Sequence, residues 1–332
     1  MLMLFRPLAS LIRTIVITTT LVTGVGFFGN PAFAKWPDRP VKLILPYGPA
    51  GVADVPARIL AEKLGTNLGA RFFVENMPGA GGISAAHAVL GATPDGYTLG
   101  FVSNGNAIAS VMFAQLPYDP VEQFQMVSQI GDFPLAFAVN AKSKYMTVED
   151  VIKEAQKNPG KLNVGTVSVG STQNFGAELL KSMAKVDFQI IPFKTSPDVA
   201  VALLRNDVDV IIDFPVAIDS RVEDGTFRYL AITSLERSTF FPNVPTVNES
   251  GMPNYELSSW NGVFAPKGVP SEILDALNHA IHDALASPDV IAAFKKIGVV
   301  AQSSNPDQLM ERLKADIKKW DAVRVKAGIP QN

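Results

Sequence analysis

Residues 41–64 form a single unit that strongly restricts what this chain can fold into. The apolar residues of Val41–Leu45 are typical of a buried strand, Pro46–Gly51 is a loop rich in Gly and Pro, and an amphipathic, helix-like segment follows. A helix that begins directly after such a loop aims free backbone N–H groups at one point, and its dipole makes that point favourable for an anion. The loop has neither the Lys-Ser/Thr ending of a nucleotide-binding P-loop nor a Ser/His/Asp set. The unit therefore indicates binding of a small acid without chemical attack on it.

A second unit of the same design lies more than a hundred residues further along the chain. Leu162–Val167 is predicted as a strand, Ser168–Asn174 as a loop and Phe175–Ala184 as a helix. Strand-like and helix-like segments alternate almost throughout, which favours an α/β fold with mainly parallel central sheets. Two such units in a chain of this length predict two lobes that face each other.

Four predicted strand ends are rich in hydroxyls, amides and glycines and carry almost no charge. They are Tyr47–Gly51, Ser103–Asn106, Ser168–Asn174 and Asp213-Phe214. Loops in general contain Gly, Ser and Asn, so one such loop would indicate nothing. Ligands of open α/β sheets bind beyond the carboxyl ends of the strands, and four such ends together favour a shared cleft between the lobes.

The first 34 residues are predicted to be a signal peptide. Arg6 and Arg13 precede or flank the mostly apolar run Ile15–Phe28, and Ala32-Phe33-Ala34 is a small-x-small cleavage site. We therefore expect cleavage after Ala34 and a periplasmic location. A retained membrane anchor is the alternative, but the run is short for a spanning helix and contains four Thr and two Gly.

Composition excludes several other classes of function. Without Arg6 and Arg13, 27 basic residues face 31 acidic ones, a net charge of −4 with His neutral, which gives no electrostatic footprint for nucleic acid or an anionic membrane. The chain has 0 Cys, which excludes disulfides, a thiolate nucleophile and a thiolate metal site. We expect no cofactor, no metal, no nucleic-acid partner and a monomer.

Seven segments carry a family resemblance, in order and at the expected spacing between Trp36 and Ile329. They are Trp36–Val41, Leu45–Asp54, Val74–Gly82, Pro94–Leu99, Asn158–Asn163, Val244–Val247 and Trp260–Pro266. Together they resemble the Bug-type receptors, the periplasmic solute-binding proteins of tripartite tricarboxylate transporters. The resemblance implies a Venus-flytrap fold, similar to type II periplasmic binding proteins, that closes on a small carboxylate. It also implies delivery of that ligand to a permease with a large and a small subunit.

The resemblance further implies where the lobes and the ligand lie. Residues 35–136 and 233–332 would form lobe 1, and residues 137–232 would form lobe 2. Hinge closure is expected at strands that cross between the lobes, near Phe133–Val139 and Tyr229–Thr233. In the family, the loop after the first strand and the facing loop of the second lobe hold the carboxylate. These loops correspond to Tyr47–Asp54 and Ser168–Asn174.

The strand ends and the resemblance together give a predicted set of ligand-binding residues. It comprises Tyr47, Gly48, Pro49, Ala50, Gly51, Asp54, Ser103, Asn104, Ser168, Gly170, Ser171, Thr172, Asn174, Thr195, Asp213 and Phe214. Asp54 is interpreted either as a helix N-cap or as a contact to the ligand through water or an amino group. Asp213 would suit an amino group of the ligand. Phe214 would pack on the ligand's carbon skeleton or in the core.

Two positions depart from the family pattern. The first loop is usually Pro-Gly-Gly, whereas this chain has Ala50, whose Cβ restricts φ and narrows the approach to the ligand. Many relatives have His where Asn174 stands, and Asn keeps hydrogen bonding without a pH-sensitive charge. We therefore expect these two positions to influence which acid is bound.

Two other functions compete with this hypothesis. An exported α/β hydrolase could use Ser103 or Ser171, although neither lies in Gly-x-Ser-x-Gly and the chain has only three His. A ligand-sensing receptor for a membrane signalling partner would use the same flytrap. Saturable binding without product distinguishes a receptor from the hydrolase, and co-purification with a membrane partner distinguishes transport from sensing.

Overall fold

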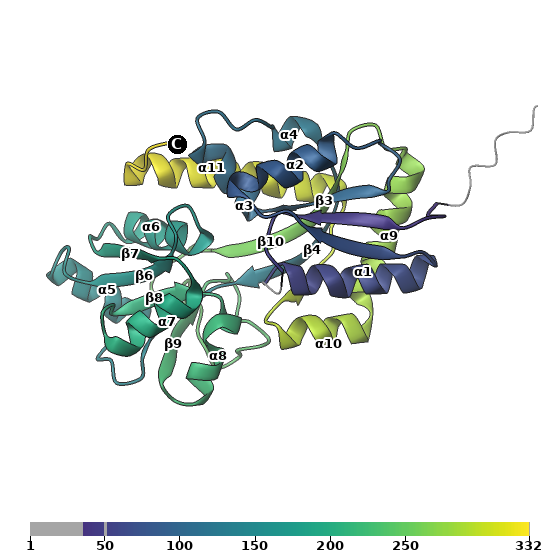
Figure 1. Cartoon of the computed structure of the whole chain (residues 1–332). Coiled ribbons are helices and arrows are strands. Elements are labelled where there is room, and N and C mark those ends of the chain that lie inside the picture. Colours follow the sequence, from purple (N-terminus) through teal and green to yellow (C-terminus); the bar gives the residue numbers. More distant parts are fainter. Residues whose placement is uncertain (1–35, 50–51, 332) are drawn as a thin grey trace, which may run out of the picture. The chain divides into compact units, whose positions relative to one another are not determined.

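The computed structural model describes residues 36–49 and 52–331 (Figure 1). The predicted signal peptide and its cleavage site lie outside the described residues, as do Ala50 and Gly51. Within the described part of the chain, no helix combines the length and the apolar character needed to cross a bilayer.

The first sheet has six strands in the order β11-β4-β10-β3-β1-β2. Its strands are β1 (Val41–Leu45), β2 (Phe72–Asn76), β3 (Thr98–Ser103), β4 (Phe124–Pro134), β10 (Ser258–Pro266) and β11 (Val300–Ala301). β1 runs parallel to β2 and β3, whereas β10 runs antiparallel to β3 and β4. Its helices are α1 (Asp54–Leu68), η1 (Ala80–Gly82), α2 (Ile83–Leu90), α3 (Asn104–Met112), α4 (Pro120–Gln123), α9 (Ser271–Ala286), α10 (Pro288–Lys296) and α11 (Pro306–Ala327).

The second sheet has five strands in the order β7-β6-β8-β5-β9. Its strands are β5 (Ala136–Asn140), β6 (Asn163–Val167), β7 (Gln189–Phe193), β8 (Val210–Asp213) and β9 (Phe227–Ile232), and its helices are α5 (Val148–Lys157), α6 (Thr172–Ala184), α7 (Ser196–Arg205) and α8 (Pro215–Glu223). β6 is parallel to β7 and β8, and β5 is antiparallel to β8 and β9. The two-lobed α/β fold is confirmed.

Two predictions about the strands need correction. Both sheets are mixed rather than mainly parallel, because β5 and β10 continue the chain after it passes from one sheet to the other and run against their neighbours. The strand expected to cross between the lobes near Phe133–Val139 is in fact two strands, β4 and β5, separated at Leu135. The apolar run is continuous in sequence, but its two halves pair with different sheets.

Two predicted loops are also shorter than expected, because their last residues form the first turns of helices. Ser103 caps α3 in a capping box with Asn106. Ser171 caps α6, which begins at Thr172 rather than at Phe175. Ser103 is also the last residue of β3, and Ser171 follows the end of β6 after three residues, so the first turn of each helix lies near the end of a strand.

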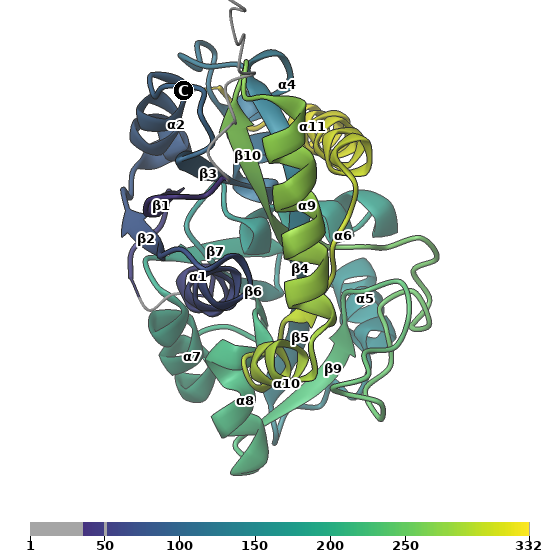
Figure 2. The same cartoon turned by 90° about the vertical axis from the view of Figure 1, so that its right-hand side faces the viewer.

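The hydrophobic core explains how these elements hold together. On one face of the first sheet, α1 and α9 pack together (Figure 2) and bury the apolar residues of β1. On the other face, one cluster extends through α3, α11 and α6 into the second sheet, and it includes Phe175 and Trp320. α11 packs against both α3 and α6. The two sheets therefore share a core in addition to their connecting segments.

Candidate functional site

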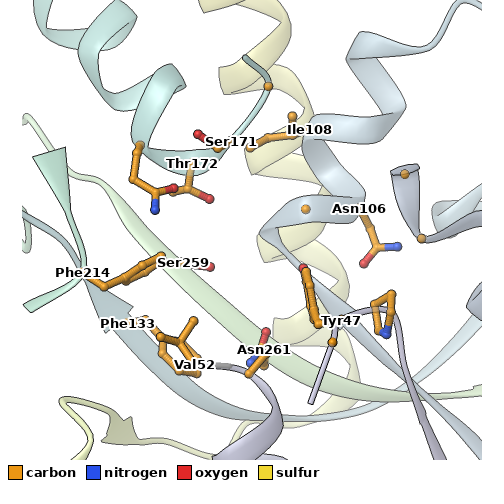
Figure 3. A pocket seen from close by; sticks show the side chains of 18 of the residues that line it. Tyr47, Val52, Asn106, Ile108, Phe133, Ser171, Thr172, Phe214, Ser259 and Asn261 are labelled. Carbon is orange, nitrogen blue, oxygen red and sulfur yellow. The ribbon is translucent and has the colours of Figure 1, made fainter. Parts of the chain in front are cut away.

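A pocket of about 540 Å³ lies where the ends of strands from both sheets meet (Figure 3). It is lined by Pro46, Tyr47, Gly48, Pro49, Val52, Ala53, Gly79, Gly81, Gly82, Gly105, Asn106, Ile108, Phe133, Gly170, Ser171, Thr172, Gln173, Phe214, Ser259 and Asn261. Ser171 and Thr172 face Tyr47 and Asn106 across the pocket (Figure 3). The loops of both repeated strand–loop–helix units therefore contribute to one site.

The N-terminus of α6 presents two unused hydrogen-bond donors to this pocket. The Ser171 hydroxyl accepts the Asn174 N–H at 3.1 Å and donates to the Val167 carbonyl at 2.9 Å. The backbone N–H groups of Thr172 and Gln173 have no acceptor among the described residues. The helix dipole adds positive potential at the same place, so this end of the pocket favours an anion.

The Tyr47 side of the pocket is fixed by hydrogen bonds around the start of α3. The Tyr47 and Ser103 hydroxyls share a hydrogen bond of 2.6 Å, and Ser103 also accepts the Gly105 N–H at 3.1 Å. Burial raises the pKa of the Tyr47 hydroxyl, which therefore stays protonated at neutral pH. Asn106 accepts the Ser103 N–H at 2.9 Å and donates to the Tyr118 hydroxyl at 2.9 Å.

Ser259 and Asn261 on β10 line the pocket and were missed by sequence reasoning. Asn261 is only 3% exposed, yet its side-chain amide has no hydrogen-bond partner within residues 36–49 and 52–331. A buried amide normally finds partners, so an uncommitted one beside a pocket is free for a ligand. The sequence did contain one indication that Asn261 is functional, because this residue lies inside the Trp260–Pro266 segment that carries the family resemblance.

The rest of the lining is apolar. Val52, Ile108, Phe133 and Phe214 supply hydrocarbon surface, and the described lining residues include no Lys, Arg, His, Asp or Glu. An acid bound here would meet neutral donors at its oxygen atoms and aromatic or aliphatic side chains along its carbon chain. In the described part of the chain, no group of three or more His, Asp or Glu side chains is arranged to hold a metal ion.

The predicted site residues fall into three groups. Those that line the pocket are Tyr47, Gly48, Pro49, Gly170, Ser171, Thr172 and Phe214. Ala50 and Gly51 lie outside the described residues. The residues that do not line it are Asp54, Ser103, Asn104, Ser168, Asn174, Thr195 and Asp213. Several of the last group support helix starts, as Thr195 does by capping α7.

Asp54 lies at the first position of α1, and Ala53 occupies the cap position, so the predicted N-cap role is corrected. Asp54 as a residue is 1% exposed. It accepts hydrogen bonds from Arg58 Nε at 2.8 Å and from Asn76 Nδ2 at 2.8 Å. Since the carboxylate is already bound by these groups, its place in the structure is a support for the first loop.

Asp213 lies behind the pocket and positions two residues that line it. Its Oδ1 accepts hydrogen bonds from Gln173 Nε2 at 2.9 Å and from the Phe214 N–H at 2.8 Å. Its Oδ2 is buried without a hydrogen-bond partner in the described ranges. Burial raises the pKa of Asp213, and contacts from Ser196, Gln173 and the Phe214 N–H oppose that shift.

The two-lobed fold and a pocket made of neutral hydrogen-bond donors define a solute-binding protein. Solved structures of this class are similar to the chain. R. palustris Rpa4515 with adipate has a TM-score of 0.77 and 31% identity, with 90% of this chain and 100% of that chain covered. MatC (Rpa3494) from Rhodopseudomonas palustris with bound malate has a TM-score of 0.72 and 29% identity, with 86% and 99% covered.

Sequence comparison then gives the family. Residues 56–329 match the model of the tripartite tricarboxylate transporter family receptor. Protein BugT of Bordetella pertussis is 33% identical over 319 residues, which cover 95% of this chain and 98% of BugT. The chain belongs to this receptor family, as the resemblance predicted. It is a solute-binding receptor and not an enzyme, so the hydrolase alternative is wrong.

Proposed function

We propose that this receptor captures a small organic acid in the pocket between its lobes and delivers it to a tripartite tricarboxylate-type permease. One observation supports a carboxylate as the class of ligand. The free N–H groups of Thr172 and Gln173 and the uncommitted amide of Asn261 all border the same cavity. Neutral donors around this cavity suit a carboxylate, because each of its oxygens accepts more than one hydrogen bond.

The apolar lining narrows the proposed ligand to acids with a hydrocarbon portion. Phe133 and Phe214 offer surface for a carbon chain next to the donors (Figure 3). The relatives solved with adipate and with malate carry acids of this kind. An aliphatic dicarboxylate of about four to six carbons is therefore the first class to test, since a 540 Å³ cavity accommodates a small ligand of that size.

The proposed mechanism is closure of two lobes, residues 35–136 with 233–332 and residues 137–232, around the ligand. Two segments connect the sheets, Leu135 between β4 and β5 and residues 233–257 between β9 and β10, and Thr233 hydrogen-bonds across them. Its N–H donates to the Leu135 carbonyl at 2.9 Å, and its carbonyl accepts the Leu257 N–H at 2.9 Å. Ligand that binds both lobes stabilises the closed state, which the permease would recognise. We place this process in the periplasm, after cleavage following Ala34.

The test is calorimetry with adipate, malate, succinate and citrate on the wild-type protein and on Asn261→Asp. The new carboxylate would lie beside the ligand's own, and two like charges about 5 Å apart repel by about 3 kcal/mol at an effective dielectric constant of about 20. We expect at least one acid to bind and Asn261→Asp to weaken it by about a hundredfold. Asn254→Asp, on the exposed surface, is the matched control. The proposal would be contradicted if none of the four acids binds the wild-type protein. It would also be contradicted if Asn261→Asp binds the acid with the same affinity as Asn254→Asp.

A further inference from the structure

Three buried side chains from three helices form a hydrogen-bonded chain that ends at the pocket. Trp320 on α11 donates from Nε1 to Asn104 Oδ1 at 2.7 Å. Asn104, at the start of α3, donates from Nδ2 to Thr172 Oγ1 at 3.0 Å. Trp320 and Asn104 are both 0% exposed, and Thr172 lines the pocket at the N-terminus of α6. The three helices pack against one another (Figure 1).

The chemistry of these groups fixes which group donates and which accepts at each step of this hydrogen-bonded relay from Trp320 to Thr172. An indole N–H can only donate, so the Asn104 oxygen must face Trp320. The Asn104 nitrogen then faces Thr172, and an amide nitrogen can also only donate. The Thr172 hydroxyl therefore acts as acceptor toward Asn104. Its own hydrogen has no acceptor in the described part of the chain, and its oxygen borders the cavity (Figure 3).

We propose that Trp320 and Asn104 are positioning residues that fix the Thr172 hydroxyl as a donor toward the bound carboxylate. The inference rests on the proposed function. Without the indole N–H, the Asn104 amide is free to rotate and present its oxygen to Thr172. The Thr172 hydroxyl would then donate to Asn104 and turn its lone pairs toward the ligand's oxygens, which repels an anion.

This relay adds a selectivity determinant outside the pocket lining. The pocket keeps the same residues and the same shape whichever way the Thr172 hydrogen points. Only the direction of one hydroxyl differs, and that direction decides whether the site offers a donor or an acceptor at this point. Trp320 would therefore influence affinity for acids although it does not line the cavity.

Trp320 also has a packing role, which the experiment must separate from the relay. Its ring meets Phe175 of α6 edge-on, with centroids 5.5 Å apart and planes at 82°. A loss of affinity in Trp320→Phe could thus come from a displaced helix. A double-mutant cycle with Thr172→Val distinguishes the two causes, because only the relay acts through the Thr172 hydroxyl.

The experiment measures adipate binding by calorimetry for the wild type, Trp320→Phe, Thr172→Val and the double variant. A hydrogen bond to a charged acceptor is strong enough that its loss in Thr172→Val should weaken binding by about tenfold or more. Trp320→Phe should weaken binding by about threefold to tenfold in the wild-type background, and by less than about twofold when Thr172 is already Val. Thr172→Ser keeps the hydroxyl and should restore most of the coupling.

Trp260→Phe is the matched control. Trp260 is also 0% exposed and donates from Nε1 to a carboxylate on α11, Asp316, at 2.7 Å, but it is not connected to Thr172. Its effect on affinity should be the same with Thr or Val at position 172. Equal effects of Trp320→Phe in both backgrounds would overturn the relay and leave the proposed function standing. If wild-type protein binds neither adipate nor the other acids, both proposals are wrong.

Discussion

The Thr233 hydroxyl links the two segments through which the chain passes between the sheets, Leu135 and residues 233–257. It accepts the Leu135 N–H at 2.8 Å and donates to the Leu257 carbonyl at 2.5 Å, and Thr233 is 0% exposed. Thr233→Val replaces the hydroxyl by a methyl group of similar size. The buried Leu135 N–H then has no acceptor left among the described residues.

The size of the effect follows from these contacts. A buried unsatisfied N–H costs about 1–3 kcal/mol, and the second lost hydrogen bond adds about 1 kcal/mol, so Thr233→Val should destabilise by about 2–4 kcal/mol. The unfolding entropy of roughly 300 residues is about 0.6 kcal/mol per kelvin near the midpoint. The melting temperature should therefore fall by about 3–6 °C.

Thr166 provides the matched control for this assay. It is also 0% exposed, on β6, but its hydroxyl has no hydrogen-bond partner within the described ranges. Thr166→Val removes an unsatisfied polar group and should stabilise by about 1 kcal/mol. Calorimetric melting of the three ligand-free proteins is the measurement. The hydrogen-bond reasoning is refuted if Thr233→Val has the same melting temperature as the wild type. It is also refuted if the melting temperature of Thr166→Val falls by as much as that of Thr233→Val.

Two further predictions concern the surroundings of the pocket. In Gly105→Ala, the new Cβ would lie 2.7 Å from the Tyr47 hydroxyl oxygen, so Tyr47 must move, and we expect weaker acid binding by calorimetry and about 1–3 kcal/mol lower stability. Gly48→Ala is the stability control, because its Cβ would have no described atom within 4 Å, and an equal loss there would contradict the steric argument. Asp213 has a raised pKa in the folded protein, so its contribution to stability is present at acid pH and is lost as pH rises through that pKa. Denaturant unfolding from about pH 4 to about pH 8 should show wild-type stability falling relative to Asp213→Asn as pH rises, and a constant difference would refute this.

Local features of the fold could be predicted well because they depend on near neighbours in the chain. The capping box at Thr147 and the Asn305-Pro306 start of α11 both follow from residue types within a few positions of each other. Leu309, Leu313, Ile317 and Trp320 recur at helical spacing, and all of them except the half-buried Ile317 are buried in α11. Helix caps and helical stripes involve residues within about four positions of each other, so their signal is complete in a short window.

Strand direction and the second half of the site could not be predicted in the same way. The apolar pattern of a strand is the same whether its neighbour is parallel or antiparallel, so the sequence did not show that β5 and β10 run antiparallel to their neighbours. Asn261 and Ser259 lie nearly ninety residues beyond Thr172 and enter the pocket only because β10 pairs between β3 and β4. No local pattern marks a residue whose role depends on such pairing.

The sequence by itself determined that this chain alternates strands and helices, that it contains two strand–loop–helix units of the same design, and that it belongs to a receptor family. Tertiary structure alone decided which donors stay unused and which are occupied. Asn104 was predicted to touch the ligand, yet its amide is bound by Trp320, 216 residues away, and by Thr172. Whether a donor or acceptor already has a hydrogen-bond partner depends on every polar group within about 3 Å of it. Folding brings most of these groups together from distant parts of the chain.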